Sequence, residues 1–393
     1  METREYKTKT MFKEMSNPVL SPDKWCIGLD IGYSAVKGYS QNSIVSFPAF
    51  AVENTGSTQI SFGYAPEDHQ AIHYRDEDGV EWSVGASAQD TISASDTSAG
   101  SLSAYGRHRY FAPMFKVLLR TGLASCLRKN QYGDPTGKKI ILQTGLPPKY
   151  LKNDEGDFRE ILLGRHHFWV KYGMQEWQEF DFELADENIL PMISQPMGTI
   201  LSISTSKDMR PVAEAGKYFN SKILIMDAGF GTLDLFPMLK GEVTVATCET
   251  DSNLGMKRVL QDTADEIQEK YGFEVSVPAM QQYLETGMIP AKSGRTYKNT
   301  AFNDILEKHS RDICYQAIDK MMNAYTITDY QYVIITGGTC AAWSNFIREH
   351  EFFKGNDVVK VVSGNQGDPT LPYIFSNVRG YYVYATVNAG KTA

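Results

Sequence analysis

Short apolar runs that end in glycine-bearing turns recur along this chain and alternate with segments of helical spacing. In the first half these patterns predict a three-strand meander, a hairpin with Asp78-Gly79 at its turn, one helix and one buried strand. Their ranges are 25–30, 35–40 and 43–50 for the meander, 73–84 for the hairpin, 111–127 for the helix and 138–143 for the strand. The stretch 91–106, rich in Ser, Thr, Ala and Gly, is predicted to be a mobile surface loop.

The second half repeats this order of elements. A second meander is followed by two helices, a strand that runs into Gly337-Gly338, and a final helix. Their ranges are 222–226, 233–238 and 241–247 for the meander, 255–271 and 302–325 for the helices, 332–336 for the strand and 372–385 for the final helix. A repeat of this length is of domain size, and helices interleaved with strands indicate α/β layers.

Length and composition restrict the class of protein. A chain of 393 residues is long for one domain, so two or more are expected. The net charge of −8 argues against direct binding of nucleic acid, because phosphate binding needs a basic face. No apolar stretch approaches the roughly 20 residues that span a bilayer, so no membrane association is expected. Residues 1–24 are polar and mixed in charge, and we expect a flexible N-terminal extension rather than a partner-binding arm.

The five cysteines are scattered along the chain and form no Cys-x-x-Cys pair. This pattern argues against a zinc site and fits a reducing, cytoplasmic location. Cys26 and Cys340 lie in or beside apolar runs, where cysteine behaves as a small buried hydrophobic residue.

The first meander contains a turn that begins with aspartate. Gly32 lets the backbone approach a phosphate, Ser34 can donate to phosphate oxygens, and Lys37 supplies positive charge. Asp30 can hold the waters of a Mg²⁺ ion, which keeps much of its hydration shell. An Asp-x-Gly sequence is also a common hairpin turn, so taken alone this motif favours the plain turn.

The second meander contains a similar turn with more glycine. Gly229 and Gly231 flank Phe230, and Thr232 adds a hydroxyl. Asp227 offers a second carboxylate to the shell of a metal ion. Two such turns, from two domains, can together hold the phosphates and metal of a nucleotide.

Two further elements carry alternative interpretations. The strand over 332–336 runs into Gly337, Gly338 and Thr339 at the start of a helix, which leaves bare backbone for a base or ribose. A tight strand–helix connection explains the same glycines. Gln195 follows an apolar strand and precedes a helix, where it can orient a water for attack on a γ-phosphate. An ordinary first residue of a helix is the plain alternative.

The order of these elements resembles that of the actin, sugar-kinase and heat-shock chaperone ATPase superfamily. Within it, the chain is most similar to the actin-like plasmid-segregation proteins of the ParM type, over residues 25–387. The resemblance implies an actin-like α/β fold of two related domains, each with a mixed five-stranded sheet flanked by helices, and a nucleotide cleft between them. The resemblance implies an N-terminal extension over 1–24 and a first domain over 25–205, on which the helix 372–387 packs. The second implied domain is 206–371.

The resemblance also assigns roles to residues. It places Gln195 and Asp227 in catalysis, and Asp30 and Asp227 at the metal through water. The nucleotide-binding residues that it implies are Asp30, Gly32, Tyr33, Ser34, Lys37, Gly229, Phe230, Gly231, Thr232, Lys257, Gly337, Gly338 and Thr339. Tyr33 departs from the family pattern, because it is bulky where a small or polar residue is common.

The function implied by the resemblance is that of an ATPase that polymerises with ATP and segregates plasmid DNA. ATP or ADP with Mg²⁺ is the implied cofactor, and slow hydrolysis near Gln195 would control filament stability. The implied partners are further copies of the chain and a ParR-like DNA-binding adaptor on a centromere-like repeat. The acidic net charge agrees with contact to DNA through an adaptor.

Three other functions use the same fold. A sugar-type kinase needs a catalytic aspartate beside an acceptor hydroxyl, and no clear candidate precedes Gln195. A chaperone would continue into a C-terminal substrate domain, and the chain ends soon after its last helix. A cell-shape protein would bring an amphipathic membrane-binding end, and only Met11, Phe12 and Met15 give residues 1–24 an apolar character.

Overall fold

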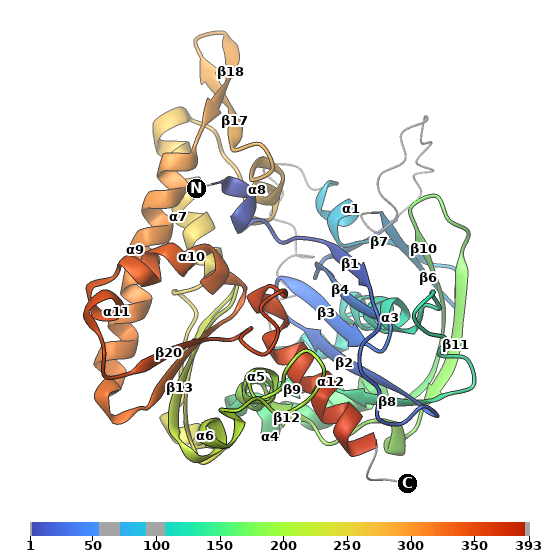
Figure 1. Cartoon of the computed structure of the whole chain (residues 1–393). Coiled ribbons are helices and arrows are strands. Elements are labelled where there is room, and N and C mark those ends of the chain that lie inside the picture. The colour runs from blue at the N-terminus through green and yellow to red at the C-terminus, as the bar shows by residue number, and fades with distance from the viewer. Residues whose placement is uncertain (1, 55–70, 92–106, 390–393) are drawn as a thin grey trace. The chain divides into compact units, whose positions relative to one another are not determined.

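The computed structural model describes residues 2–54, 71–91 and 107–389 (Figure 1). The contacts between residues divide the described chain into two compact units. Unit 1 contains residues 2–7 and 199–377, and unit 2 contains residues 8–198 and 378–389 apart from the undescribed ranges. Most of the predicted mobile loop 91–106 lies outside the described residues.

Unit 2 is built around a mixed sheet that contains the first meander. Its strands lie in the order β1-β4-β3-β2-β8, and β2 pairs in parallel with β8 and antiparallel with β3. The strands are β1 Met11–Glu14, β2 Lys24–Ile31, β3 Ala35–Ser40, β4 Ser43–Pro48 and β8 Lys139–Gln143. Every residue of β2 is buried, as expected for an internal strand that is covered on both faces.

A second, antiparallel sheet completes unit 2. Its strand order is β11-β10-β6-β7-β5, which leaves β11 at one edge. The strands are β5 Ala51–Glu53, β6 Ile72–Asp76, β7 Glu81–Val84, β10 Gly164–Tyr172 and β11 Gln178–Leu184. Helix α3 (Pro113–Leu127) packs against strands of both sheets, so nearly all of its residues are buried (Figure 1).

Shorter elements border these sheets. A two-stranded parallel pair joins β9 to β12 and leads directly into helix α5. The remaining elements are β9 Gly145–Leu146, β12 Ile193–Ser194, α1 Ala86–Gln89, α4 Pro148–Leu162, α5 Gln195–Ile203 and α12 Ser376–Ala389. Helix α12 belongs to unit 2 from Val378 onward, and α5 belongs to it up to Gly198.

Unit 1 repeats the meander in a six-stranded sheet. The order is β15-β14-β13-β19-β20, with β16 also paired to β14, and the pairs β13–β19 and β19–β20 are parallel. The strands are β13 Lys222–Ala228, β14 Leu233–Leu239, β15 Glu242–Val243, β16 Glu249–Asp251, β19 Tyr332–Thr336 and β20 Lys360–Ser363.

Helices pack on this sheet and on one another. Helix α10 packs against β13, β19 and α9, and α9 in turn packs on α7. The helices are α6 Ala215–Asn220, α7 Met256–Tyr271, α8 Val277–Tyr283, α9 Asn303–Ala324, α10 Gly338–Glu349 and α11 Glu351–Gly355. Gly272 ends α7 with a left-handed backbone, φ 62°, as its sequence predicts.

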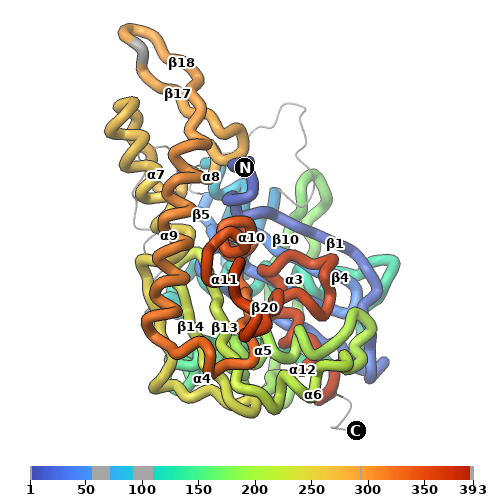
Figure 2. The backbone as a smooth tube through the Cα atoms, turned by 60° about the vertical axis from the view of Figure 1, so that its left-hand side comes forward, coloured from blue at the N-terminus to red at the C-terminus, as the bar shows by residue number. Residues whose placement is uncertain are grey.

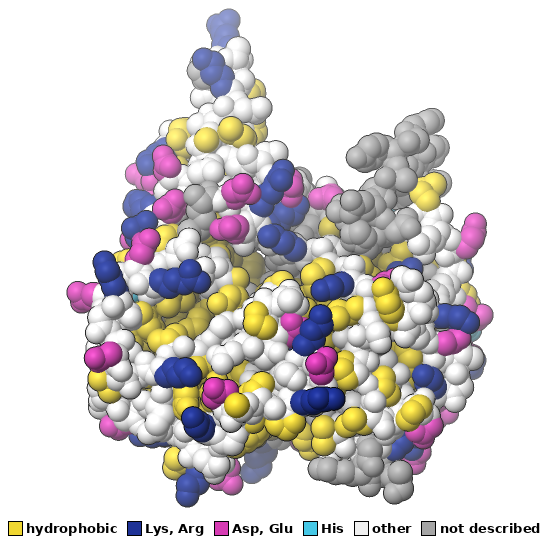
Figure 3. All heavy atoms as spheres, viewed as in Figure 1, with side chains coloured by type: hydrophobic (Ala, Val, Ile, Leu, Met, Phe, Trp, Pro, Cys, Tyr) yellow, Lys and Arg dark blue, Asp and Glu magenta, His cyan; other side chains and the backbone are white. Residues whose placement is uncertain are grey.

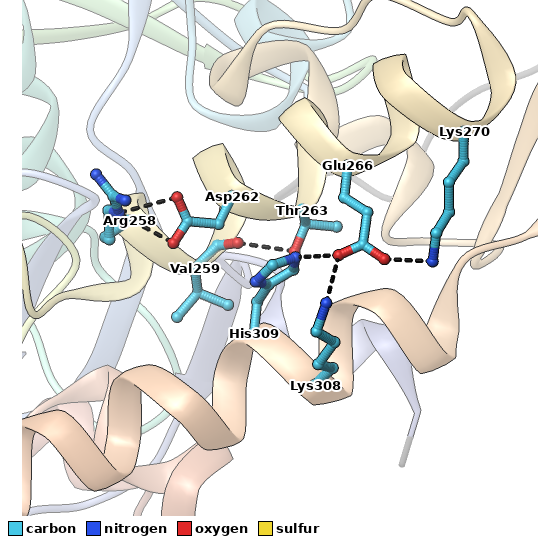
Figure 4. A network of polar contacts seen from close by, with 8 residues as sticks. All are labelled: Arg258, Val259, Asp262, Thr263, Glu266, Lys270, Lys308 and His309. Atoms are coloured by element: carbon cyan, nitrogen blue, oxygen red, sulfur yellow. Dashed lines mark hydrogen bonds and ion pairs between the residues drawn. The ribbon is translucent and has the colours of Figure 1, made fainter.

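A polar network ties α7 to α9 (Figure 4). The carboxylate of Glu266 on α7 accepts hydrogen bonds from Lys270 of the same helix, and from Lys308 and His309 of α9 at 2.9 and 2.7 Å. The hydrogen bond from Lys270, followed by that from Lys308, lowers the pKa of Glu266 to about 2. The carboxylate therefore stays ionised at neutral pH and holds the two helices in register.

A polar hairpin separates α8 from α9. Strands β17 (Met288–Ser293) and β18 (Thr296–Ala301) pair with each other and with no other described strand. In both ribbon views the hairpin extends beyond the ends of α7 and α9 (Figures 1 and 2). The sequence did not predict it, because the buried alternation is confined to Ile289 and Ala291 of β17, and no residue of β18 is buried.

The N-terminal segment is not the flexible extension that the sequence predicted. Residues Thr3–Tyr6 form a 3-10 helix, η1, on unit 1, where Thr3 and Tyr6 are buried and Thr3 Oγ1 donates to the carbonyl of Leu284 over 2.7 Å. Strand β1 then adds to the edge of the unit 2 sheet through antiparallel pairing with β4. The few apolar residues of this polar stretch are used for packing.

The predicted α/β class is confirmed, and so are the first meander, the hairpin at Asp78-Gly79 and the helices α3, α7 and α9. The second meander is confirmed in its first two strands, whereas the predicted strand 241–247 appears as the short strand β15 followed by a 3-10 helix over Val245–Thr247. The predicted final helix appears as a 3-10 turn over Tyr373–Phe375 followed by α12. Cys26 and Cys340 are buried, as predicted. Within the described ranges, no helix has the length and apolar character to cross a membrane.

Candidate functional site

Asp30 and Lys37 stand directly opposite each other on β2 and β3, at the first aspartate-led turn. The Lys37 ammonium lies 2.6 Å from Oδ2 of Asp30, and Asp30 is only 4% exposed. A buried carboxylate requires such a partner, because removing an unpaired charge from water costs several kcal/mol, on the order of 3–5 when one partner is lost. The pair thus fixes both predicted side chains beside the turn.

The turn between these strands is tight. The Gly32 N–H donates to the carbonyl of Ala35 over 3.0 Å, and the Ser34 carbonyl accepts from Ala49 over 2.8 Å. A Cβ on Gly32 would lie 3.1 Å from the Ala35 oxygen and 3.4 Å from the Lys37 ammonium. Glycine therefore lets the lysine approach the turn without displacement.

Tyr33, the residue that departs from the family pattern, packs within its own unit. The guanidinium of Arg109 lies 4.8 Å from the centre of the Tyr33 ring and donates to the Ile31 carbonyl over 2.6 Å. A cation over an aromatic face is attracted by the ring. Arg109 thereby adds a second positive charge beside the first turn. No local pattern pointed to it, because about 75 residues separate it from Tyr33 along the chain.

The second turn is closed by its own backbone and fixed to a helix. The Gly229 N–H donates to the Thr232 carbonyl over 2.8 Å. The first N–H groups of α7, at Met256 and Lys257, donate to the carbonyls of Gly229 and Phe230 over 3.3 and 2.8 Å. The positive end of the α7 dipole therefore abuts the turn, and Lys257 lies in the first turn of that helix.

Gly255 explains how α7 comes so close. A Cβ at this position would lie 2.7 Å from the Phe230 oxygen and 2.9 Å from the Thr232 nitrogen. Asp234, just after the turn, accepts hydrogen bonds from the hydroxyls of Thr232 and Thr250, both over 2.7 Å. These contacts give Thr232 and Asp234 a structural role in holding the turn.

The glycine element adjoins the second turn within unit 1. Strands β13 and β19 are parallel, with Asp227 opposite Thr336, so Gly337 follows at the same edge of the sheet. Gly337 has φ +92°, and a Cβ there would lie 2.4 Å from Oδ1 of Asp227. The Thr339 hydroxyl donates to the Gly229 carbonyl over 2.7 Å. Residues more than 100 positions apart in sequence thus form one cluster.

Asn377 is a contact of Asp227 whose role the sequence did not indicate. Its Nδ2 donates to Oδ2 of Asp227 over 3.3 Å, and its Oδ1 accepts from the Thr199 hydroxyl over 2.7 Å. Asp227 itself is partly buried. The chain Thr199–Asn377–Asp227 orients the carboxylate at the end of β13.

Gln195 lies in unit 2 as the first residue of α5, immediately after β12. Its side chain is partly buried, and within the described residues it makes no side-chain hydrogen bond. An amide in that condition can bind a water molecule with both of its polar atoms. Its catalytic role stays a prediction.

The predicted residues are thus divided between the two units. Unit 1 brings Asp227, the turn 229–232, Lys257 and the glycines 337–338 together, while unit 2 holds the first turn and Gln195. Among the residues that the structure describes, no three His, Cys, Asp or Glu side chains cluster as a metal site. A Mg²⁺ ion bound through its waters and through phosphates needs only one or two carboxylates.

Comparisons with known proteins bear on the fold. Residues 28–198 match the family model described as actin like proteins N terminal domain. A search of curated proteins found no match.

Solved structures resemble the chain over nearly its whole length. A 15-stranded ParM filament from Clostridium botulinum has a TM-score of 0.69 at 19% identity, covering 93% of this chain and 99% of that one. A non-polymerisable quadruple mutant of pCBH ParM has a TM-score of 0.67 at 18% identity, covering 94% and 100%. Bacillus thuringiensis ParM with AMPPNP has a TM-score of 0.59 at 15% identity, covering 93% and 99%. At these identities the likeness shows the fold, which is actin-like.

Proposed function

We propose that this chain, which has the actin-like fold of the ParM-type proteins, is an ATPase that assembles into filaments with ATP and segregates plasmid DNA. The observation that carries the proposal is the cluster in unit 1, where Gly337 lies against Asp227 and Thr339 bonds to the turn at Gly229. Two glycine-bearing segments that are distant in sequence are held together at the ends of parallel strands. Ligands of α/β sheets bind at such carboxyl ends.

In this proposal the phosphates of ATP or ADP are bound by both aspartate-led turns. The first turn supplies the Lys37 ammonium, and the second lies at the positive end of α7. A Cβ on Gly229 would meet nothing closer than 3.4 Å, so protein packing does not demand glycine there. Close approach of a phosphate to the backbone is a reason for glycine at this position.

The residues present fit a hydrated Mg²⁺ ion. Asp227 ends an internal strand with its carboxylate oriented by Asn377, and Asp30 is held beside Lys37. A bound Mg²⁺ would neutralise charge on the phosphates during transfer to water. Asp227 and Asp30 would bind its waters, and Gln195 would orient the attacking water.

Self-assembly and the link to DNA complete the proposal. A solved structure that resembles this chain over 93% of its length is a ParM filament, which supports assembly of copies of this chain. The net charge of −8 supports contact with plasmid DNA through a ParR-like adaptor rather than directly. The cytoplasm is the compartment that such a partner requires.

Pelleting and light scattering of the purified chain with ATP, with ADP and without nucleotide test the proposal. We expect scattering to rise above a threshold protein concentration with Mg-ATP and to decay as phosphate is released. ADP and buffer alone should give little pelleted protein. Flat scattering with ATP at high protein concentration, despite measured ATP binding, would reject filament assembly.

A further inference from the structure

The hairpin formed by β17 and β18, residues 288–301, carries only positive charge. Its cations are Lys292, Arg295 and Lys298, and no Asp or Glu lies between residues 286 and 303. Tyr297 is 70% exposed. In the space-filling view, Lys and Arg side chains gather at the end of the hairpin (Figure 3). We call residues 288–301 the basic hairpin.

Unit 2 carries the opposite charge along one edge of a sheet. Strand β11 is an edge strand, and the segment around it, residues 173–188, contains no Lys or Arg. Its exposed acidic residues are Glu176, Glu179, Asp181, Glu183, Asp186 and Glu187. We call residues 176–187 the acidic edge.

Cations of the same unit neutralise only part of this edge. Asp181 pairs with Arg165, Asp186 with Arg159 and Glu187 with Lys139, at 2.6, 2.7 and 2.8 Å. Glu179 contacts the His167 ring at 2.9 Å. Within the described residues, Glu176 and Glu183 pair with no cation. The acidic edge is therefore left with uncompensated negative charge.

We propose that the basic hairpin of one copy of this chain contacts the acidic edge of another copy. The inference rests on the self-assembly proposed above and assigns two surfaces to it. The two surfaces differ, so the contact is heterologous and can repeat without closing, as a filament requires. Complementary charge also steers the encounter of subunits and fixes their register.

A second copy fits the hairpin better than nucleic acid does. Three cations can neutralise about three phosphates, which gives weak and strongly salt-dependent binding. The chain as a whole, at −8, repels DNA. In a filament, by contrast, each weak contact recurs at every subunit, so its effect on assembly accumulates.

Charge reversal tests the contact from both sides. One variant combines Lys292→Glu, Arg295→Glu and Lys298→Glu, and a second combines Glu176→Lys and Glu183→Lys. We expect each to raise the critical concentration for ATP-dependent pelleting about tenfold or more. A chain that carries both sets should recover most of the wild-type assembly, because the charges attract again.

A control carries the same change of charge elsewhere in unit 1. Lys207→Glu, Lys240→Glu and Lys354→Glu alter three exposed lysines outside the hairpin. ATP binding is measured for every variant, so that a misfolded chain is recognised.

The outcomes separate the two proposals. Suppose that the wild type assembles and the hairpin variant has the same critical concentration as the control with three altered lysines. The proposed contact is then wrong, while the proposed function stands. Failure of the combined variant to recover would equally reject the pairing, and so would a hairpin variant that assembles normally but loses binding to plasmid DNA. Absence of wild-type assembly would overturn the proposed function itself.

Discussion

Asp227 is the residue at which the elements of unit 1 meet, because it contacts Asn377 and lies against Gly337. We expect Asp227→Asn to keep the size and the polar contact and to remove only the charge. Steady-state Mg-ATP hydrolysis should fall about 100-fold, since one preorganised group at the phosphates contributes on that scale.

Asp251→Asn, which neutralises a partly buried carboxylate on β16 of the same sheet, is the control and should change turnover little. Thermal unfolding without nucleotide should be nearly the same for both variants. Turnover at the wild-type rate in Asp227→Asn would remove Asp227 from the catalytic group.

Gln195 is the second residue whose role is chemical in this proposal. We expect Gln195→Ala to slow phosphate release and to prolong the life of filaments, because the attacking water loses its orientation while ATP binding is kept. Phosphate release and scattering are followed on the same sample. Gln268→Ala, at an exposed position on α7, serves as the control. Normal release in Gln195→Ala would transfer this role to another residue.

His166 makes stability depend on pH. It is buried in β10, its ring stacks on Phe182 at 5.3 Å, and its Nε2 donates to the Leu162 carbonyl over 2.9 Å, while Nδ1 has no partner among the described residues. Burial lowers the pKa of His166 below its ordinary value, although the hydrogen bond to Leu162 opposes this shift. The nearby charges of Arg120 and Lys116 lower the pKa further, and Glu77 raises it.

Because the folded pKa is depressed, the unfolded chain takes up a proton first as the pH falls. Stability should therefore drop below about pH 6.5, the pKa of an exposed histidine, by up to about 1.4 kcal/mol per pH unit. The free energy of unfolding can be measured in urea between about pH 5 and 7.5. We expect it to fall less steeply toward low pH for His166→Gln than for the wild type. His167→Gln, at a partly exposed neighbouring position, is the control. If the free energy of unfolding depends on pH in the same way in the wild type and in His166→Gln, the assignment to His166 is wrong.

At the same scale, the sequence predicts some contacts and not others. The pair Asp30–Lys37 follows from a short hairpin, since residues on adjacent strands of one meander face each other. The contact of Gly337 with Asp227 requires the parallel pairing of β13 with β19, which no local pattern encodes. Arg109 and Asn377 were missed for the same reason, because their partners are distant in sequence.

Among the elements, those that bury one regular face were predictable. The meanders and the helices α3, α7 and α9 show apolar spacing that matches their burial. The β10–β11 hairpin escaped prediction, although Phe168, Val170 and Tyr172 alternate toward the core, because His166 occupies a core position of the same pattern. Among its described residues, the basic hairpin buries only Ile289 and Ala291, a pattern too short to predict a strand.

The N-terminal segment is the element whose prediction was reversed, and its anchor is Tyr6. Burial raises the pKa of Tyr6 to about 12, and the ring is buried in unit 1. We expect Tyr6→Ala to destabilise the local fold by about 3 kcal/mol, the usual cost of removing a buried aromatic side chain. Hydrogen exchange followed by mass spectrometry should then show faster exchange around residues 284–287, which Thr3 contacts.

The exposed part of the same segment provides the control. Arg4 and Lys7 pair with Glu285 at 3.0 and 2.9 Å, and such surface pairs contribute about 0–1 kcal/mol. Replacing both by alanine should leave exchange at 284–287 nearly unchanged. Equal exchange in Tyr6→Ala and the wild type would mean that the segment does not stabilise unit 1.

For the whole molecule, the proposal requires that one nucleotide stabilise both units. A ligand that binds only the folded chain stabilises it by about 2.7 kcal/mol at 100 times its dissociation constant. We therefore expect Mg-ADP at that excess to slow hydrogen exchange at the turn 30–37 of unit 2 and at the turn 227–232 of unit 1. Two separate sites would instead protect each turn with its own concentration dependence.

Substitutions in one unit distinguish one shared nucleotide site from two separate sites when hydrogen exchange is measured in the other unit. Lys37→Ala removes the cation of the first turn, and Asp227→Asn removes the charge of the second. If one nucleotide binds both groups, each substitution should weaken its binding as a whole. The nucleotide-dependent protection from hydrogen exchange should then be lost at both turns in each variant. Protection that persists at 227–232 in Lys37→Ala, with unchanged affinity, would restrict the nucleotide to unit 1 and remove the first turn from the site.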